Sequence, residues 1–344
     1  MKLFRTIIDS LLHAKPVRVA TIIATSGSTP APEQSQMVVV FDAGLQVHGT
    51  VGGGCLDENI LWQIGHEPSD VPVRIATFDL NDDEGESGLM CGGTATIMQE
   101  ALNAEMFPIY QRLYDLFTQG KTCVLATFWN GKGEYSKAVY NTDATFLFGS
   151  ELDEIKNEMI QQVVHQCIAS KKSIYSTDVS YQSVLQYLEP QPSVLIFGGG
   201  HVGKVVSQCA AIAGFRVTII DDRLTYANRE RFPEAAEIVC EGIDAAFQRL
   251  HIDNNYVVIV TRGHRYDELI LEKIMSYDPK YVGMIGSKRK VAITFGNLKA
   301  RGVSEVKLRL VHAPIGLKIN ANSVGEIGIS IVAELIAVMR NAQK

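Results

Sequence analysis

The chain has 344 residues, of which 46% are hydrophobic and 20% charged, and its formal net charge is −6. At about 150 residues per domain, this length predicts two domains, each able to bury a core without disulfides or a structural metal. The negative net charge argues against a nucleic acid or an anionic membrane as a partner, because both favour a basic surface.

The cysteines and the N-terminus indicate the compartment. Six cysteines are scattered without C-x-x-C or zinc-finger spacing: Cys55, Cys91, Cys123, Cys167, Cys209 and Cys240. This pattern is typical of reduced thiols rather than of a disulfide framework. In the first 13 residues Arg5 and Asp9 interrupt the apolar residues at helical spacing, which predicts an amphipathic helix and not a signal peptide. No apolar run reaches the ~18 residues of a membrane span, so we expect a cytoplasmic protein.

Residues 1–189 mix strands and helices without regular alternation, which predicts a mixed α+β domain. After the first helix, strands are predicted at 17–24, 37–41, 45–50, 73–78, 94–99, 123–129, 134–140, 173–178 and 183–188. Helices are predicted at 56–64, 106–118 and 151–170. No internal repeat is evident. Two prolines at 189–192 mark a linker, so we predict an N-terminal domain of residues 1–189 and a C-terminal domain of residues 190–344.

From residue 193 onward, strands and helices alternate. Strands are predicted at 194–197, 216–221, 236–239, 256–260 and 281–285. Helices are predicted at 201–213, 244–250, 267–275 and 288–301, with a short or absent one at 232–234 and a closing helix at 323–339. Alternation of this kind predicts an α/β domain of the Rossmann type, a doubly wound parallel sheet.

The first turn of this domain fits the dinucleotide fingerprint G-x-G-x-x-G, between an apolar strand and a helix. Gly198 permits the tight turn, Gly200 lets backbone amides approach a pyrophosphate, and Gly203 lets the helix pack on the strand. Asp221 and Asp222 follow about 20 residues later, where a carboxylate would bind ribose hydroxyls. The sequence therefore predicts a nucleotide site.

Two alternatives stay open at this turn. A Rossmann scaffold can persist after its ligand has been lost, so the fold alone does not establish binding. His201, inside the turn, either packs on the sheet at the helix start or contacts the ligand.

A second candidate site follows the later strands, at whose carboxyl ends ligands gather in open α/β sheets. Thr261-Arg262-Gly263-His264 follows one strand, with Asp267 at the start of the next helix. Gly286 and Ser287 follow the next strand, directly before the three cations that begin with Lys288. Glycine and serine at a helix start with cations behind them form an anion-binding arrangement. The alternative is that these cations only form a solvated face.

Two glycine–cysteine elements stand out in the first domain, Gly52-Gly53-Gly54-Cys55 and Cys91-Gly92-Gly93. Glycines permit a close backbone approach, and a thiolate at a helix start is favoured by the helix dipole. Such a thiolate could ligate a soft metal or carry sulfur. The alternative is that these cysteines are small core residues, as the other four are expected to be. Asp57 and Glu58 are read as acids that cap the helix start.

In this order the motifs resemble the XdhC/CoxI family, the accessory factors of xanthine dehydrogenase and related molybdenum hydroxylases. The resemblance spans nearly the whole chain. It depends on blocks at 27–30, 49–55, 91–93, 187–190, 198–203, 261–267, 283–290, 312–317 and 326–334.

The resemblance implies a cofactor chaperone rather than an enzyme. Family members are understood to bind the molybdenum cofactor (molybdopterin), to protect it while a cysteine desulfurase exchanges an oxo ligand for sulfur, and to insert it into the apo-enzyme of the molybdenum hydroxylase. On this sequence Cys55 and Cys91 would contact molybdenum or its sulfur. The Rossmann turn and Gly286-Ser287-Lys288 would hold a phosphate of the pterin cofactor or of a nucleotide. A homodimer is the expected assembly.

One position departs from the family pattern. The family loop usually runs Gly-Ser-Thr-Pro-Arg, and Ala31 stands where the arginine is expected. An arginine would bind an anion through two parallel hydrogen bonds, so its absence weakens the case for cofactor binding by this loop. Two other functions stay open. An NAD(P)-dependent oxidoreductase could use His264 with Asp267, or His312, and an interaction scaffold would carry a vestigial nucleotide fold.

Overall fold

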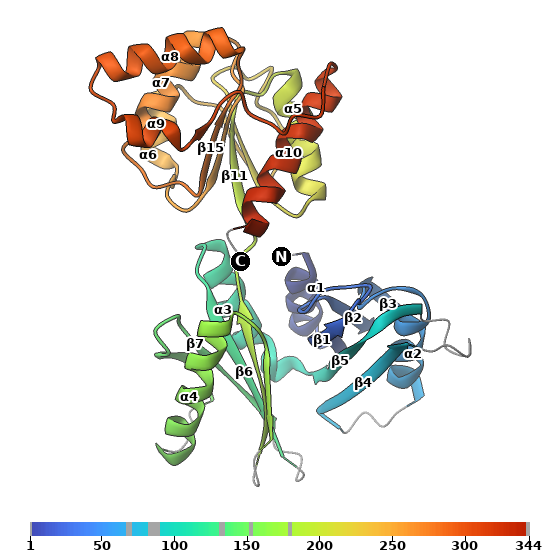
Figure 1. Ribbon diagram of the computed structural model, residues 1–344. Helices are drawn as coiled ribbons and strands as arrows, with labels where there is room; N and C mark the ends of the chain where they lie inside the picture. Colours follow the sequence, from blue (N-terminus) through green and yellow to red (C-terminus); the bar gives the residue numbers. More distant parts are fainter. Residues whose placement is uncertain are drawn as a thin grey trace. The chain divides into compact units, whose positions relative to one another are not determined.

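The computed structural model describes residues 2–66, 71–81, 90–130, 135–150, 154–177 and 181–341. It divides into two compact units, Met1–Pro190 and Gln191–Lys344, and the division falls in the proline-containing segment 189–192 (Figure 1). Within the described ranges, no helix is both long enough and apolar enough to cross a membrane.

The first unit holds two antiparallel five-stranded sheets, which confirms a mixed α+β domain. Its elements follow in the order α1 (Lys2–Leu12), β1 (Val17–Gly27), β2 (Gln36–Phe41), β3 (Leu45–Gly49), α2 (Gly54–His66), β4 (Val73–Asn81), β5 (Met90–Leu102), the 3₁₀ turn η1 (Ala104–Met106), α3 (Phe107–Thr118), β6 (Cys123–Trp129), β7 (Tyr135–Tyr140), β8 (Phe146–Gly149), α4 (Glu154–Ser170), β9 (Ile174–Thr177) and β10 (Gln182–Leu188).

Helices cover the sheets of this unit with their apolar faces. α1 is amphipathic as predicted, because Ile7 and Leu11 are buried while Arg5 and Asp9 are exposed. α1 and α3 pack on one face of the first sheet, and α2 packs on the other. The second sheet is covered by α4 on one face and by α3 on the other.

The two halves of the first unit share one topology, so the unit contains an internal repeat that the sequence does not reveal. Each half runs helix, three strands, helix, two strands, and the strand orders β3-β2-β1-β5-β4 and β8-β7-β6-β10-β9 match position for position. Gly49 pairs with Met37 as Gly149 pairs with Ala138. A Cβ on either glycine would lie 2.3 Å from a carbonyl oxygen of the neighbouring strand. The repeat preserves backbone geometry rather than residue identity, which is why inspection of the sequence misses it.

The second unit is a six-stranded, all-parallel sheet with helices on both faces. Its elements are β11 (Ser193–Phe197), α5 (His201–Ile212), β12 (Arg216–Ile220), β13 (Glu237–Val239), α6 (Ile243–Arg249), β14 (Tyr256–Ile259), α7 (His264–Ile274), β15 (Tyr281–Met284), α8 (Lys288–Ala300), α9 (Glu305–Arg309), β16 (Val311–His312) and α10 (Val324–Asn341).

The strand order β13-β12-β11-β14-β15-β16 is the 3-2-1-4-5-6 order of the Rossmann fold. One face of the sheet packs on α5 and α10, and the other packs on α6, α7, α8 and α9 (Figure 1). The predicted fold class, a mixed N-terminal domain followed by a Rossmann-type sheet, is confirmed. The chain reverses its strand order between β11 and β14, and ligands of such sheets bind at the carboxyl ends beside that point.

Two features differ from the prediction. β5 begins at Met90, so Cys91-Gly92-Gly93 lies within a strand and not ahead of it. This extension is sterically allowed because Gly93 has no side chain, and a Cβ there would lie 2.3 Å from the Ser26 carbonyl oxygen. The strands β8 and β16 and the helix α9 were not predicted, because segments of two to five residues carry too few positions for a periodic pattern. At 232–234, where a short helix or none was predicted, the structure has no helix.

Candidate functional sites

Three glycine-containing segments of the first unit meet at one place. Gly27, the last residue of β1, pairs with Gly93 of β5, and a Cβ on Gly27 would lie 2.7 Å from the Gly92 carbonyl oxygen. A Cβ on Gly52 would lie 2.7 Å from the ring of Pro30. These approaches need residues without side chains. Folding therefore joins the end of β1, the start of β5 and the loop before α2.

The loop before α2 is built around one carboxylate. Asp57, in the first turn of α2, accepts hydrogen bonds from the Thr50 hydroxyl at 2.7 Å and from the Val51 amide at 3.0 Å. The glycines at 52–54 take φ angles of 146°, 79° and 53°. Apart from their own neighbours along the chain, no atom of the described residues lies within 4 Å of the Cβ positions of the last two glycines, so their Cβ side is open within that part of the chain. Asp57 thus holds the loop that precedes α2.

The cysteines differ in accessibility. Cys55 is exposed in the first turn of α2, so it is not a core residue. Cys91 lies in β5, but its side chain is outside the described part of the structure. Cys123 and Cys167 are buried, and burial raises the pKa of each thiol to about 12. Among the described side chains, no three His, Cys, Asp or Glu residues cluster around a metal site. Molybdenum contacts at Cys55 and Cys91 therefore stay a prediction.

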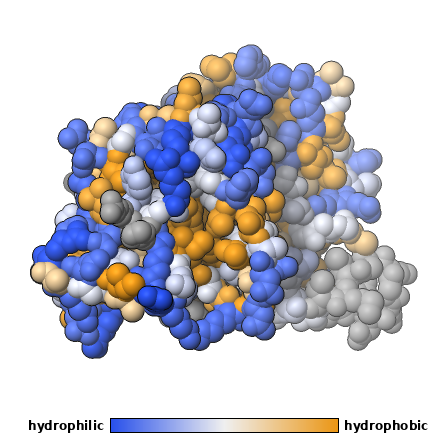
Figure 2. Space-filling view, turned by 90° about the horizontal axis from the view of Figure 1, so that it is seen from above, coloured by the Kyte–Doolittle hydropathy of each residue, from blue (hydrophilic) through white to orange (hydrophobic). Residues whose placement is uncertain are grey.

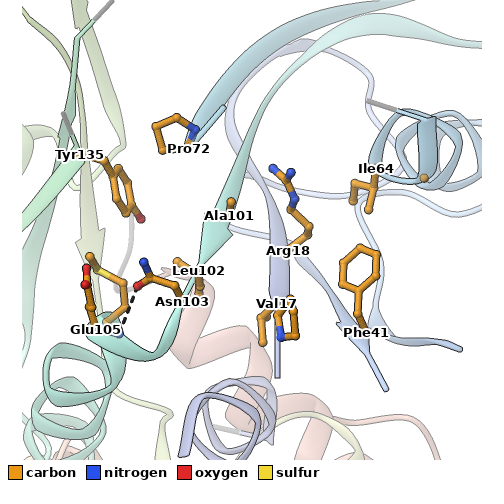
Figure 3. Close-up of a pocket in the computed structure, with 13 residues that line it drawn as sticks. Val17, Arg18, Phe41, Ile64, Pro72, Ala101, Leu102, Asn103, Glu105 and Tyr135 are labelled. Carbon is orange, nitrogen blue, oxygen red and sulfur yellow. Dashed lines mark hydrogen bonds between the residues drawn. The ribbon is translucent and has the colours of Figure 1, made fainter. Parts of the chain in front are cut away.

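A cavity of about 700 Å³ lies at the other end of β1, away from these glycine segments. In Figure 3 Tyr135 and Glu105 lie to one side of β5, while Arg18, Phe41 and Ile64 lie to the other. None of the residues that the sequence singled out lines this cavity, and its charged lining residues are one cation, Arg18, and one carboxylate, Glu105. The size of this cavity does not by itself link it to the predicted cofactor and nucleotide sites.

In the second unit the glycine turn has the geometry of a phosphate-binding loop. Gly198 has a φ of 116°, and a Cβ there would lie 2.4 Å from the Val260 carbonyl oxygen. A Cβ on Gly203 would lie 1.9 Å from the Gly198 carbonyl oxygen. Gly200, the N-cap of α5, has no atom within 4 Å of its Cβ position, so this helix start is open to an anion. His201 is exposed and does not pack on the sheet.

The hydrogen-bonding capacity of the Asp221 carboxylate is fully used within the protein. It accepts hydrogen bonds from the Gly199 amide and from Nε and Nη2 of Arg223, each at 2.9 Å. The Arg223 amide is a fourth donor at 3.1 Å, and only 5% of the Asp221 side chain is exposed. The Arg223 guanidinium also stacks 3.8 Å above the ring of Tyr226. Asp221 thus joins the glycine turn to the loop after β12.

Asp222 is the exposed carboxylate of this site. Its side chain is 38% exposed and lies 3.6 Å from Nη2 of Arg262 and 3.8 Å from Nε of Arg223. The residues around it line a cavity of about 40 Å³ at the ends of β11, β12, β13 and β14, with Glu241 on the wall. In Figure 2, which faces the carboxyl ends of these strands, apolar residues gather near the centre within a hydrophilic border.

Asp267 connects the two loops of the second predicted site. It is completely buried, and its carboxylate accepts hydrogen bonds from the Thr261 hydroxyl at 2.6 Å and from the Lys290 ammonium at 2.5 Å. Ser287 is the N-cap of α8, and its side-chain oxygen accepts a hydrogen bond from the Lys290 amide. One of the three predicted cations therefore holds the loops together.

The start of α8 is the accessible part of this second site. Lys288 and Arg289 are exposed there, and Gly286 packs against the aliphatic stem of Lys290. The side chain of His264 is outside the described part of the structure. Two cations thus lie in solvent at a helix start, where an anion would bind.

The tail is held by a carboxylate that the sequence analysis did not single out. Glu334 on α10 accepts hydrogen bonds from the Tyr281 hydroxyl at 2.9 Å and from the Gly316 amide at 2.6 Å, and it lies 2.7 Å from Nδ1 of His312. Burial and the neighbouring Glu334 carboxylate raise the pKa of Tyr281. The 312–317 segment is thereby fixed to the sheet and to α10, so His312 has a structural partner.

Two family models match the chain. The model of the XdhC and CoxI family matches residues 11–64, and the model of the XdhC Rossmann domain matches residues 194–335. Together they cover more than half of the chain, in the order in which the two units follow one another. The chain belongs to the XdhC and CoxI family.

Relatives of this family member are distant in sequence. A Bacillus subtilis protein whose name describes it as a probable subunit of xanthine dehydrogenase is 25% identical over 340 residues, which are 97% of this chain and 96% of the relative. The uncharacterized protein YqeB of Escherichia coli is 33% identical over 154 residues, 44% of this chain and 28% of YqeB. A crystal structure from Bacillus halodurans, described as a xanthine dehydrogenase, has a TM-score of 0.79 and 23% identity over 98% of this chain and 96% of that chain. The likeness supports the fold.

Ala31 separates this member from the usual family pattern. It is 8% exposed and lies in the apolar cluster that includes Val51 and Leu56. The position of the usual arginine therefore contributes to the core under the glycine segments here and offers no charge to an anion.

Proposed function

We propose that this member of the XdhC and CoxI family binds the molybdenum cofactor and inserts it into a molybdenum hydroxylase of the xanthine dehydrogenase type. The protein is then an accessory factor whose cargo is the cofactor, and it needs no catalytic acid–base pair. Family membership supports this function, as does the name of the Bacillus subtilis relative, which links that protein to xanthine dehydrogenase. The partners proposed are the hydroxylase apo-enzyme, a cysteine desulfurase that sulfurates the bound cofactor, and a second copy of the chain.

The observation that carries the proposal is the meeting of three glycine segments beside an exposed thiol. Cys55 lies at the start of α2, directly after three glycines with positive φ, and the last two of these have open space in front of them. A thiolate is a soft ligand suited to molybdenum or its sulfur, and bare backbone lets a bulky group come close. The donor set therefore fits the cofactor.

The second unit supplies a separate anion site. Space is open at the Cβ position of Gly200, the N-cap of α5, and the exposed Lys288 and Arg289 lie at the start of α8. Helix starts favour phosphate through unpaired amides and the helix dipole. These features support a role in holding a phosphate of the cofactor or of a nucleotide.

The test measures cofactor retention. The protein is purified from cells that make the molybdenum cofactor, and bound pterin is released and measured as its fluorescent oxidation product. We expect pterin with the wild-type chain and a loss of roughly tenfold or more with Cys55→Ala, since a metal–thiolate contact is removed.

Cys240→Ala is the matched control, because Cys240 is exposed too but lies in the second unit. It should retain pterin like the wild type. Pterin that neither co-purifies nor binds when added would overturn the proposal, and hydride transfer from a bound nicotinamide would favour the oxidoreductase instead. Full retention by Cys55→Ala would exclude the thiol contact.

A further inference from the structure

The pocket beside the glycine turn holds a carboxylate that is free for a ligand and a cation that covers it. Asp221 has four donors from the protein and only 5% of its side chain exposed, so it has no capacity left for a ribose. Asp222 lines the same pocket, and the two arginines near it stand at 3.6 Å and 3.8 Å, beyond hydrogen-bonding distance.

We propose that Asp222 binds the ribose diol of a ribonucleoside diphosphate, and that Arg262 is a latch that covers Asp222 until this ligand displaces it. The inference deepens the proposed function, because it names a ribonucleotide as the part of the cargo that the second unit holds. Two ribose hydroxyls would give Asp222 two charge-assisted hydrogen bonds in place of one long ion pair.

The size of the pocket supports a latch. Its cavity of about 40 Å³ is far smaller than ligand pockets, which measure about 300–1,000 Å³. The Arg262 side chain contributes to the wall, and its guanidinium lies 5.4 Å from the centre of the Tyr266 ring. Withdrawal of Arg262 would open the mouth between the loops after β12 and β14.

The two arginines differ in their freedom to move. Arg223 is held by Asp221 through two nitrogens and stacked on Tyr226, and a quarter of its side chain is exposed. Arg262 is 48% exposed, and its ion pair with Asp222 is of the exposed type that contributes little to stability. A ligand can therefore displace Arg262 but not Arg223.

The base of the 261–266 loop stays fixed while its tip moves. Thr261 is anchored by the buried Asp267 through its amide at 3.2 Å and its hydroxyl at 2.6 Å. Asp267 is in turn paired with Lys290. Movement is thus confined to the residues that follow Thr261, which include the latch. A ligand with a 2′-phosphate should be rejected, because that phosphate would meet the Asp222 carboxylate.

Calorimetric titration of the full-length protein with ADP, GDP, CDP and UDP tests the proposal. At least one diphosphate should bind, and its 2′-deoxy form should bind roughly tenfold or more weakly, because a hydrogen bond to a charged group is lost. A 2′-phosphorylated form of the same nucleotide should also bind more weakly. Asp222→Ala removes the partner of both ribose hydroxyls, so it should weaken binding of the ribonucleotide at least as much as the loss of the 2′-hydroxyl does.

Removal of the Arg262 charge should change the affinity in the opposite direction. Arg262→Gln should bind the same diphosphate about two- to fivefold more tightly, because no ion pair has to be broken. Arg309→Gln, which removes an exposed arginine paired with Glu305, should leave affinity unchanged. Weaker binding by Arg262→Gln would show that the arginine contacts the ligand and would overturn the latch.

Absence of binding by all four diphosphates, to the wild type and to Arg262→Gln, would overturn the ribose site, as would unchanged affinity in Asp222→Ala. These outcomes are distinguishable from failure of the proposed function. A chain that retains pterin but binds no nucleotide contradicts only this inference. A chain that binds nucleotide but never retains pterin contradicts only the cofactor role.

Discussion

The Asp221 carboxylate holds the glycine turn against the loop after β12, and its titration should affect stability. Burial disfavours its charged form, but hydrogen bonds from Arg223 and from the Gly199 amide outweigh burial, so the pKa of Asp221 lies below its ordinary value. A pKa that is lower in the folded state stabilises the fold at pH values above the unfolded pKa of about 4. This stabilisation is lost as the pH falls through the folded-state pKa.

We therefore expect Asp221→Asn to lower the free energy of unfolding by about 1–3 kcal/mol near neutral pH. The difference from the wild type should shrink as the pH falls below about 4. Urea unfolding at a series of pH values measures it, with the half-exposed Asp222→Asn as the control. A difference that stays constant from neutral to acidic pH would mean that the charge of Asp221 does not stabilise the fold.

Thiol accessibility gives a second prediction for single residues. Burial raises the pKa of Cys123 and Cys167 to about 12, so at pH 8 both are protonated as well as covered. Cys55 and Cys240 are exposed. Iodoacetamide at about pH 8 should alkylate the exposed pair in the native protein and modify Cys123 and Cys167 only after unfolding, as peptide mass spectrometry would show. Native modification of Cys123 would contradict its burial.

Residue types and spacing predicted part of each site. The glycine turn could be predicted, because its conformation depends on local backbone geometry. The sequence could not predict which of the two adjacent aspartates, Asp221 or Asp222, is free, because that depends on which of them Arg223 bonds. Arg262 and Glu334 lie in segments that the sequence singled out, but only tertiary structure brings them to Asp222 and His312. His312 and Glu334 are 22 residues apart in the sequence, and nothing in this spacing predicts that they meet.

At the scale of an element, two glycines of the second unit should respond oppositely to alanine. Gly203, in the first turn of α5, would place a Cβ 1.9 Å from the Gly198 carbonyl oxygen. Gly296, exposed in the interior of α8, has no atom within 4 Å of its Cβ position. Gly203→Ala should destabilise the unit and disturb the turn, whereas Gly296→Ala should stabilise it by about 0.5–1 kcal/mol. Thermal unfolding compares the two, and a stabilising Gly203→Ala would contradict the close approach.

The repeated halves of the first unit are joined by a buried ion pair. Lys137 of β7 is fully buried and lies 2.5 Å from Glu100 of β5, and it also donates to the Thr127 hydroxyl at 2.7 Å. In the other half Gln36 occupies the position of Lys137 and donates to Thr21 at 3.1 Å. Gln186 occupies the position of Glu100. Each half thus carries one amide and one charged residue at these equivalent positions, Gln36 and Glu100 in the first half and Lys137 and Gln186 in the second.

This correspondence suggests a double-mutant cycle. Lys137→Gln or Glu100→Gln alone should cost about 3–5 kcal/mol, because each leaves a buried charge without its partner. The double variant places amides at both positions, as at the equivalent residues Gln36 and Gln186, and should cost clearly less than the sum of the single variants. Urea unfolding of the four proteins gives the coupling energy. Additive costs would mean that the two charges do not stabilise each other.

The second unit was easier to predict than the first at the scale of the whole molecule. Alternation of strand and helix, with right-handed crossovers, leaves few arrangements for a parallel sheet. The antiparallel strands of the first unit can pair in many orders, and nothing local distinguishes β3-β2-β1-β5-β4 from the others. Gly49 and Gly149, whose equivalence shows the repeat, could be recognised only after both pairings were known.

Each unit has cores built from its own residues, and this predicts independent folding. The apolar clusters of the first unit draw on residues between Leu3 and Leu188, and those of the second on residues between Val194 and Met339. Both fragments exceed the size of about 100 residues at which one core suffices. Residues 1–190 and 191–344, expressed separately, should each show dispersed amide resonances and one cooperative urea transition. A fragment with collapsed resonances and no transition would mean that its core needs the rest of the chain, and the ribose site could then be tested only in the full-length protein.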